Sequence, residues 1–269
     1  MAEINKKQIQ TTEVLSWKGL HLFGAGLCAL KVKILLDLKK LPYESHDIDF
    51  FADKNLEPYF LGINIRKQQP VLVDNGTVLR EGNDMLIWLD EHHEKKREYM
   101  LVGEDEALQK MLDTQSELHA CQMGLVTYWL PGALMVPKKK NVDKYRNYPA
   151  KNLDPEDVVF WENAIAMMDK MASGEISIPS KEEALKDTFM KLEGIYNTLD
   201  EHLSHQKYLV DNQLSLADIS IAPNIVFGTM MEGYPTESLH PNLHRWLMML
   251  MKIPAFKPHL ETNILPPPA

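Results

Sequence analysis

Cys28 is the strongest candidate in this chain for a chemically reactive residue, because of its thiol and its position. It lies near the start of a helix predicted over residues 27–40, and Lys31 follows one turn later. A helix N-terminus and a nearby cation both stabilise a thiolate, the form of cysteine that acts in nucleophilic and exchange reactions. From Leu20 to Val32 the chain has no serine, threonine or tyrosine to take that role. The alternative is that Cys28 is a small buried hydrophobe in the helix core.

Strands and helices alternate around Cys28. Residues 20–23 are typical of a short strand, and apolar residues at helical spacing predict the helix over 27–40. Leu41-Pro42 ends that helix because proline cannot continue it, and residues 43–48 roughly alternate as a second strand. A strand–helix–strand unit of this kind places its two strands in parallel.

A hairpin and a further helix follow this unit. Residues 55–61 predict a short helix, and Asn75-Gly76 between two β-branched runs is a strong signal for a tight hairpin. The hairpin strands are predicted over residues 69–73 and 77–79, and the next helix over 81–91. The predicted order is therefore β-α-β-α-β-β-α, an α/β domain over residues 19–97.

Helical patterns dominate the rest of the chain, which predicts an all-helical domain over residues 98–262. They cover residues 104–128, 155–172, 184–203, 215–227 and 241–252. The fourth begins with Ser215 and Asp218, a capping-box pair with a structural role. Within this domain an insert over 137–180 is polar and proline-containing, which is typical of a lid or a disordered loop. A disordered leader over 1–18 and an extended tail over 263–269 complete the organisation.

The composition argues against several classes of function. A formal charge of −9 is unfavourable for a nucleic-acid partner, and the short basic run at 138–140 is expected to be a solvated loop. Only two cysteines are present, and no apolar stretch is long enough to span a membrane. A cytoplasmic location follows by default, since the N-terminus lacks a signal-peptide pattern. His92, His93 and His119 lack partners at metal-ligand spacing, so no metal site is predicted.

The order and spacing of these motifs resemble the cytosolic glutathione transferase superfamily over most of residues 20–260. The matching pieces are residues 69–76, similar to that family's strand–hairpin with a cis proline; residues 81–89, similar to the helix start that follows; and residues 208–218, similar to a helix start in its C-terminal half. Residues 27–32 are most similar to the bacterial branch that includes tetrachlorohydroquinone dehalogenases and lignin β-etherases. The resemblance implies a thioredoxin-like domain followed by a helical bundle, and a homodimer.

The resemblance also implies glutathione as co-substrate. The residues implied to bind it are Lys67, Gln69, Pro70, Glu81, Gly82 and Asn83. The backbone of Gln69, before the cis proline, would pair with the cysteinyl part of glutathione. Glu81 would bind the γ-glutamyl amine, and the helix N-terminus would bind the neighbouring carboxylate. A cation at Lys67, or at the adjacent Arg66, would pair with the glycine carboxylate.

The implied reaction is attack by the glutathione thiolate on an apolar electrophilic, haloaromatic or ether substrate. Tyr128 and Trp129 are the residues expected to contact that substrate in the cleft between the halves. Cys28 matches the cysteine of the branch's Ser-x-Cys-Ser-x-Lys pattern, which forms a mixed disulfide with glutathione.

Several positions depart from the family pattern, and they lie at the implied site. Gly26 stands where the pattern has its first serine, Gln69 where the family usually has valine, and Gly82 where it has a serine hydroxyl. The Gly82 change removes a hydrogen bond worth on the order of 1 kcal/mol, for which Asn83 is a candidate substitute. Ala29 replaces the pattern's second serine. The alternative function is therefore a non-catalytic binding or structural protein with a degenerate glutathione site.

Overall fold

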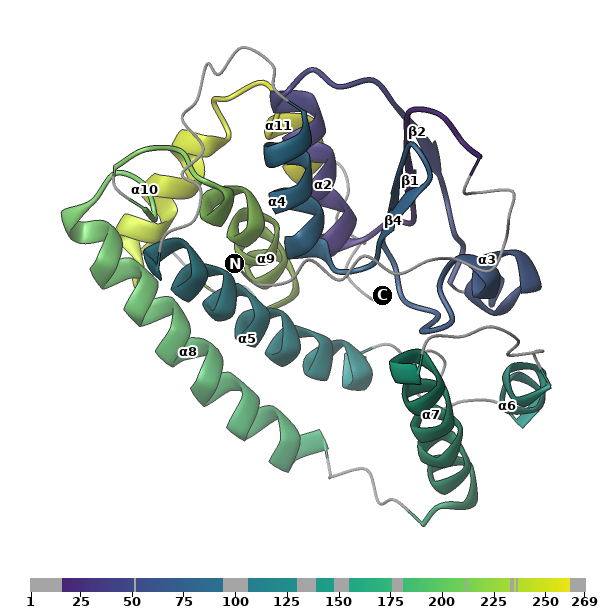
Figure 1. The fold of residues 1–269 in the computed structure, drawn as a ribbon. Helices are drawn as coiled ribbons and strands as arrows, with labels where there is room; N and C mark the ends of the chain where they lie inside the picture. The colour runs from purple at the N-terminus through teal and green to yellow at the C-terminus, as the bar shows by residue number, and fades with distance from the viewer. Residues whose placement is uncertain are drawn as a thin grey trace.

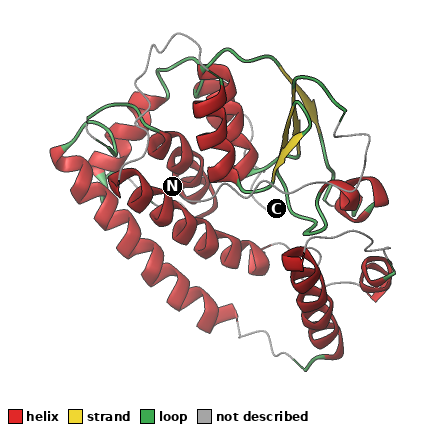
Figure 2. Cartoon of the chain, viewed as in Figure 1, coloured by secondary structure: helices red, strands yellow, loops and turns green. Residues whose placement is uncertain are grey.

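The predicted architecture, an α/β half followed by a helical half, is confirmed (Figure 1, Figure 2). The structure is a computed structural model that describes residues 16–50, 52–93, 106–129, 139–147, 155–175, 181–210, 212–232, 235 and 237–261. Most of the expected leader, residues 1–15, and the expected tail lie outside the described residues. Trp17 is described, and it stacks on Phe23 with ring centroids 5.6 Å apart.

The first half is a four-stranded sheet with the strand order β2-β1-β3-β4. Strand β1 (Leu20–Phe23) pairs in parallel with β2 (Tyr43–His46), because helix α2 (Leu27–Leu38) makes the crossover between them. The hairpin of β3 (Val71–Asp74) and β4 (Thr77–Leu79) adds to β1 antiparallel. The short 3-10 helix η1 (Lys54–Leu56) and α3 (Pro58–Ile63) precede the hairpin, and α4 (Gly82–His92) follows it.

Successive side chains of β1 point to opposite faces of the sheet, and they show that α2 and α4 cover one face and α3 covers the other. Leu20 and Leu22 belong to the large core that α2 and α4 share with the helical half. Phe23 points to the other face, where it packs with Phe60 and Ile63 of α3. The starts of α2 and α4 therefore lie on the side of the sheet that faces the helical half (Figure 1).

The helical half is built around α5 (Glu106–Trp129) and α9 (Leu216–Glu232), which pack against each other. Helix α9 also packs on α2, and α8 (Lys181–His205) packs on α5 and on α10 (Pro241–Leu250). The short α11 (Lys257–Glu261) contacts α2. One hydrophobic core thus joins the two halves, and it fixes α5 opposite the N-termini of α2 and α4.

The insert carries two helices rather than the one that was predicted. The expected helix is present as α7 (Pro155–Ser173), but Lys139 and Lys140, expected in a solvated loop, begin the additional helix α6 (Lys139–Arg146). Apolar residues of α6 and α7 pack on η1, α3 and the segment after it; the buried members are Leu56, Leu61, Ile65, Val142, Tyr145 and Met168. The described helices of the insert therefore belong to the packed structure around α3 (Figure 1).

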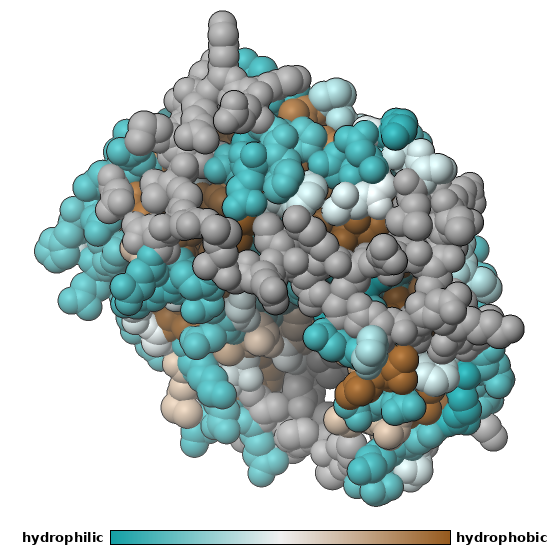
Figure 3. All heavy atoms as spheres, in the orientation of Figure 1, coloured by the Kyte–Doolittle hydropathy of each residue, from teal (hydrophilic) through white to brown (hydrophobic). Residues whose placement is uncertain are grey.

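The described surface is mainly hydrophilic on the face shown in Figure 3, where hydrophobic colour is confined to separate patches. Among the described helices, none is long and apolar enough to cross a membrane.

Candidate functional site

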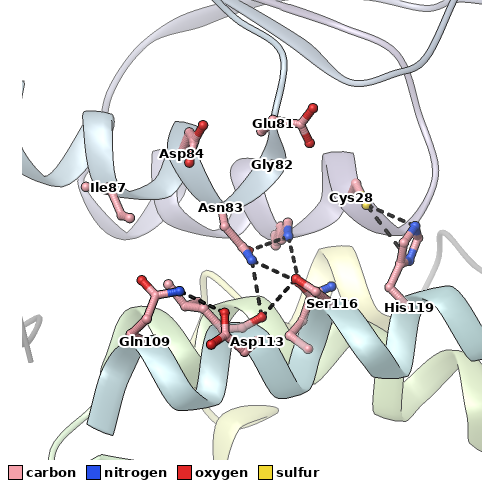
Figure 4. Close-up of a pocket in the computed structure, with 13 residues that line it drawn as sticks. Cys28, Glu81, Gly82, Asn83, Asp84, Ile87, Gln109, Asp113, Ser116 and His119 are labelled. Carbon is pink, nitrogen blue, oxygen red and sulfur yellow. Dashed lines mark hydrogen bonds between the residues drawn. The ribbon is translucent and has the colours of Figure 1, made fainter. Parts of the chain in front are cut away.

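A cavity of about 430 Å³ lies where the two halves meet. The start of α2 contributes Cys28 and Lys31, and the start of α4 contributes residues 81–84. Opposite them, α5 contributes a row of side chains that ends at His119 (Figure 4). The cavity therefore brings together the N-termini of two helices, each with free N–H groups and the positive end of a helix dipole.

Cys28 faces His119 across this cavity. The sulfur lies 3.6 Å from Nε2 and 4.0 Å from Nδ1 of the imidazole, within hydrogen-bonding range for sulfur (Figure 4). Cys28 is partly exposed, so a reagent in the cavity can reach it. A cysteine beside an imidazole is the usual arrangement for an activated thiol nucleophile.

The surroundings of Cys28 favour the thiolate. Burial acts to raise the pKa of the thiol, but the hydrogen bond with His119 and the charge of Lys31 outweigh it, so that the pKa is lowered. The negative charge of Glu81 opposes this effect. Because thiolate persists to lower pH when the pKa is lowered, Cys28 is the more reactive at neutral pH.

Lys31 is a buried cation held by neutral groups. Its ammonium donates to Asn83 Oδ1 at 2.7 Å, to Gln115 Oε1 at 3.2 Å and to Ser220 Oγ at 3.4 Å, so it links α2 to α4, α5 and α9. Burial lowers the pKa of Lys31, while the negative charges of Cys28, Glu81 and Asp84 favour its charged form. The cation thus depends on the negative charge at this end of the cavity.

Gly82 makes room for that cation. A Cβ atom at position 82 would lie 2.6 Å from Cε and 3.1 Å from Nζ of Lys31, closer than side chains tolerate. The serine that the family has here could not coexist with Lys31 in its present position. Asn83 does not simply replace that serine, because its side chain bonds to Lys31, Gln115 and Ser220.

Gly82→Ser is therefore expected to displace the Lys31 ammonium while leaving the fold intact, since the far end of a lysine side chain can move. The lost hydrogen bonds should lower the free energy of unfolding by about 1–2 kcal/mol. Moving the cation away should raise the pKa of Cys28, so alkylation of Cys28 should require a higher pH. The measurement is the pH dependence of iodoacetamide labelling, followed by peptide mass spectrometry to separate Cys28 from Cys121.

Gly194→Ala is the matched control, since a Cβ at this α8 position would meet no atom within 4 Å. It should stabilise the protein by about 0.5–1 kcal/mol and leave the labelling profile unchanged. An unaltered profile in Gly82→Ser would show that Lys31 does not act on Cys28.

Glu81 lies at the mouth of the cavity, and its partner is Arg66 rather than Lys67. Arg66 Nη1 donates to Glu81 Oε1 at 3.1 Å, and Arg66 Nε donates to the buried Asp157 of α7 at 3.2 Å. Burial raises the pKa of Glu81, and Arg66 opposes the rise. The carboxylate remains half exposed, so a cationic group of a ligand can still approach it.

Of the other candidate residues whose side chains the structure describes, Lys67, Gln69 and Pro70 do not line this cavity. Lys67 lies with its ammonium 5.6 Å from the ring centre of Tyr145. The peptide bond between Gln69 and Pro70 is cis, as the resemblance implies. Tyr128 and Trp129 end α5, and their side chains lie outside the described residues.

The remaining departures from the family pattern also have structural partners. Gln69 Oε1 accepts a hydrogen bond from the backbone N–H of Ala25 at 3.2 Å, and a Cβ at Gly24 would lie 2.5 Å from that oxygen. Gly26 has a φ of 83° and a ψ of −177°, a conformation open essentially to glycine alone. Its carbonyl accepts from the N–H groups of Ala29 and Leu30 at the start of α2.

His119 is a group of this site that the sequence did not single out as functional. His119 is 91 residues from Cys28 in the chain, and no local pattern connects the two. Arg66 was expected, as an alternative to Lys67, to pair with the glycine carboxylate of glutathione, whereas in the structure it pairs with Glu81.

Comparisons with known proteins match both halves of the chain to one family. Residues 25–92 match the N-terminal domain of glutathione S-transferase, and residues 163–254 match its C-terminal domain. The protein LigF of Sphingobium sp. strain SYK-6 is 26% identical over 91% of this chain and 93% of its own length. Glutathione S-transferase 1 of Dianthus caryophyllus is 25% identical over 90% of this chain and 94% of its own length.

Solved structures show the same fold. The β-etherase LigF from the same Sphingobium strain has a TM-score of 0.67 at 24% identity, covering 90% of this chain and 99% of its own. Glutathione transferase F7 from Populus trichocarpa has a TM-score of 0.63 at 20% identity, covering 91% and 100%. The two matching domains lie in the family's order and together span more than half of the sequence, so the chain belongs to the glutathione S-transferase family of enzymes.

Proposed function

We propose that this protein is a glutathione-dependent transferase in which Cys28 takes a direct part. The observation that supports it most is the position of Cys28, partly exposed at the start of α2 and 3.6 Å from the His119 imidazole. Such a pair supplies a thiolate where a second thiol or its disulfide can reach it.

Glutathione fits the charges around the start of α4. The N–H groups at this helix N-terminus would bind the γ-glutamyl carboxylate, and the acidic side chains of Glu81 and Asp84 would attract its ammonium group. In Figure 4 both carboxylates point away from α5, whereas Asn83 points toward it. The glutathione thiol would then lie toward Cys28, which lines the same cavity.

The proposed substrate is an apolar aryl ether, haloaromatic compound or related electrophile. The glutathione thiolate forms a carbon–sulfur bond, and the phenolate or halide leaves with the electron pair of the bond that breaks. The name β-etherase, carried by one similar protein, favours the ether class among these. Cys28 would exchange with glutathione disulfide, forming the Cys28–glutathione disulfide and releasing one glutathione thiolate.

The same geometry argues against a degenerate glutathione site. Gly82 accommodates Lys31, Gly26 provides the backbone conformation at the start of α2, and Gln69 bonds to the Ala25 amide. Gly82 and Gln69 are thus matched by contacts in the structure, and Gly26 is matched by a backbone conformation that a serine would rarely adopt.

Calorimetric titration of glutathione tests this proposal. We expect sub-millimolar binding to the wild type and about tenfold weaker binding to Glu81→Gln, which removes a charge-assisted hydrogen bond to the ammonium. Glu91→Gln, at the exposed far end of α4, is the matched control and should bind like the wild type. Binding proteins should then be assayed for phenol or halide release from aryl ethers and haloaromatics. Absence of glutathione binding would reject the enzyme and favour the non-catalytic alternative.

A further inference from the structure

A cluster of potential metal ligands lies on the opposite face of the sheet from the Cys28 cavity. His21 of β1 and the β2 residues Glu44 and His46 each offer one ligand atom, and these atoms lie within 4.8 Å of one another. His21 is opposite Glu44 in the parallel register, and His46 lies two residues beyond Glu44, so all three project from the same face. That face also carries Phe23 and is covered by α3, not by α2 and α4.

The two contacts of His21 Nδ1 are close to the edge lengths of a tetrahedral site, and His46 approaches the other oxygen of the Glu44 carboxylate. His21 Nδ1 is 3.2 Å from His46 Nε2 and 3.5 Å from Glu44 Oε2, and His46 Nε2 is 3.7 Å from Glu44 Oε1. Bonds of about 2.0–2.2 Å from a tetrahedral ion to nitrogen and oxygen would require separations of about 3.3–3.6 Å. With one ligand atom taken from each residue, the three atoms lie within 4.8 Å of one another, so rotation of the exposed Glu44 carboxylate would let them share one ion.

The hydrogen bonding of His21 leaves its Nδ1 atom available to bind a metal ion. Its Nε2 lies 3.0 Å from the carbonyl oxygen of Lys18, which can only accept, so Nε2 carries the proton in the neutral ring. Nδ1 then holds the lone pair and faces the other two ligands. Metal-binding histidines are oriented by such a bond from the second ring nitrogen to a carbonyl group.

Aromatic stacking holds both imidazoles in place before any ion binds. The Trp17 ring lies 4.7 Å from that of His21 and 5.6 Å from that of His46, and the Phe23 ring lies 4.4 Å from that of His46. The two histidines are mostly buried, whereas Glu44 is two-thirds exposed and leaves the site open on one side. The arrangement is preorganised on the histidine side, and water could supply a fourth ligand.

We propose that His21, Glu44 and His46 bind one divalent first-row transition-metal ion, of which Zn²⁺ is the type that fits best. Two imidazole nitrogens and one carboxylate suit Zn²⁺, Cu²⁺, Ni²⁺ and Co²⁺, whereas Mg²⁺ and Ca²⁺ require a shell of oxygen ligands. The ion would join the edge strand β2 to β1. This departs from the expectation of no metal site, which was based on His92, His93 and His119.

Calorimetry of the full chain with Zn²⁺ tests the proposal directly. One ion should bind per chain, and His46→Asn and Glu44→Gln should each weaken binding by at least about tenfold. His244→Asn, at a partly exposed position of α10, is the matched control and should bind like the wild type. Glu44 is exposed, so its substitution tests the site without disturbing the core.

A second measurement uses Trp17 as a reporter. Open-shell Cu²⁺ at this site should quench Trp17 fluorescence, and Trp17→Phe should abolish that component while Zn²⁺ binding persists. Zn²⁺ should also raise the Tm of the wild type but not of His46→Asn, because an ion that binds only the folded state stabilises it. Zn²⁺ binding that is unaffected by His46→Asn and Glu44→Gln, or that is lost in Cys28→Ala instead, would overturn the proposal, as would absence of Zn²⁺ binding.

Discussion

Cys28→Ala is expected to lower kcat/KM for glutathione transfer by about 100-fold or more, which is the usual scale for loss of a proton-transfer group beside the attacking glutathione thiol. Cys28 is partly exposed at the cavity, and its hydrogen-bonding partner is His119, so the substitution removes chemistry rather than core packing. The measurement is the initial rate with glutathione and an aryl ether or haloaromatic substrate, with the fold checked by circular dichroism.

Two further variants make this result specific. Cys121→Ala removes the other cysteine, on α5, and should keep most of the activity, since Cys121 does not line the cavity. Cys28→Ser keeps a hydrogen-bonding group but cannot form a thiolate near neutral pH. Full activity in Cys28→Ser would show that the side chain only donates a hydrogen bond to glutathione. Loss of activity with retained glutathione binding would assign the thiolate itself a role.

The exchange step has its own test. Incubation of the wild type with glutathione disulfide should attach one glutathione to Cys28, with release of one reduced glutathione. Peptide mass spectrometry should find the adduct on Cys28 and not on Cys121. His119→Ala should slow the reaction, because the imidazole helps to lower the pKa of the Cys28 thiol. An adduct on Cys121 alone would contradict the proposed exchange.

The fold could be predicted from the sequence because its signals are local. The Asn75-Gly76 turn, the proline after α2 and the 3.6-residue periodicity of the long helices each arise within a few residues. The main part of the fold that the sequence did not predict is helix α6 in the insert. Helix α6 is polar in composition, and it is stabilised by contacts such as that of Tyr145, whose hydroxyl donates to the carbonyl of Ile65 80 residues earlier. Phe189, at helical spacing with buried α8 residues, is itself exposed.

The candidate site could be predicted only where it lies at a helix start. Cys28 and Glu81 follow from position, since each marks the N-terminus of a helix that the sequence predicts. His119 comes from α5, and its approach to Cys28 depends on how the two halves pack. The contact between Gly82 and Lys31 could not be predicted from the sequence either. In the sequence Gly82 only lacks the serine hydroxyl, whereas in the structure the Lys31 side chain fills the space that a serine side chain would need. The same holds for His21 and His46, which are brought together by parallel pairing.

The second large effect is expected from Asp218, the residue that closes the capping box at the start of α9. Its carboxylate accepts four hydrogen bonds: from the N–H and hydroxyl of Ser215, both at 2.8 Å, from the N–H of Leu209 at 3.0 Å, and from the indole of Trp246 at 2.7 Å. Asp218 is fully buried, so water cannot replace these bonds without entering the core. One side chain thus ties the start of α9 to α10 and to the segment after α8.

Asp218→Ala would leave these donors buried without an acceptor, so the free energy of unfolding should fall by about 3–5 kcal/mol. At about 2–4 °C per kcal/mol for a chain of this size, the Tm should fall by roughly 10 °C. Asp218→Asn keeps one acceptor oxygen and should lose less stability, whereas Asp187→Ala, on the exposed side of α8, should change the Tm little.

Because α9 packs on both α2 and α5, loosening it should also disturb the pairing of Cys28 with His119. Thermal unfolding followed by circular dichroism checks the first effect, and a higher pH for Cys28 alkylation checks the second. A Tm for Asp218→Ala equal to that of Asp187→Ala would mean that the four donors find other acceptors.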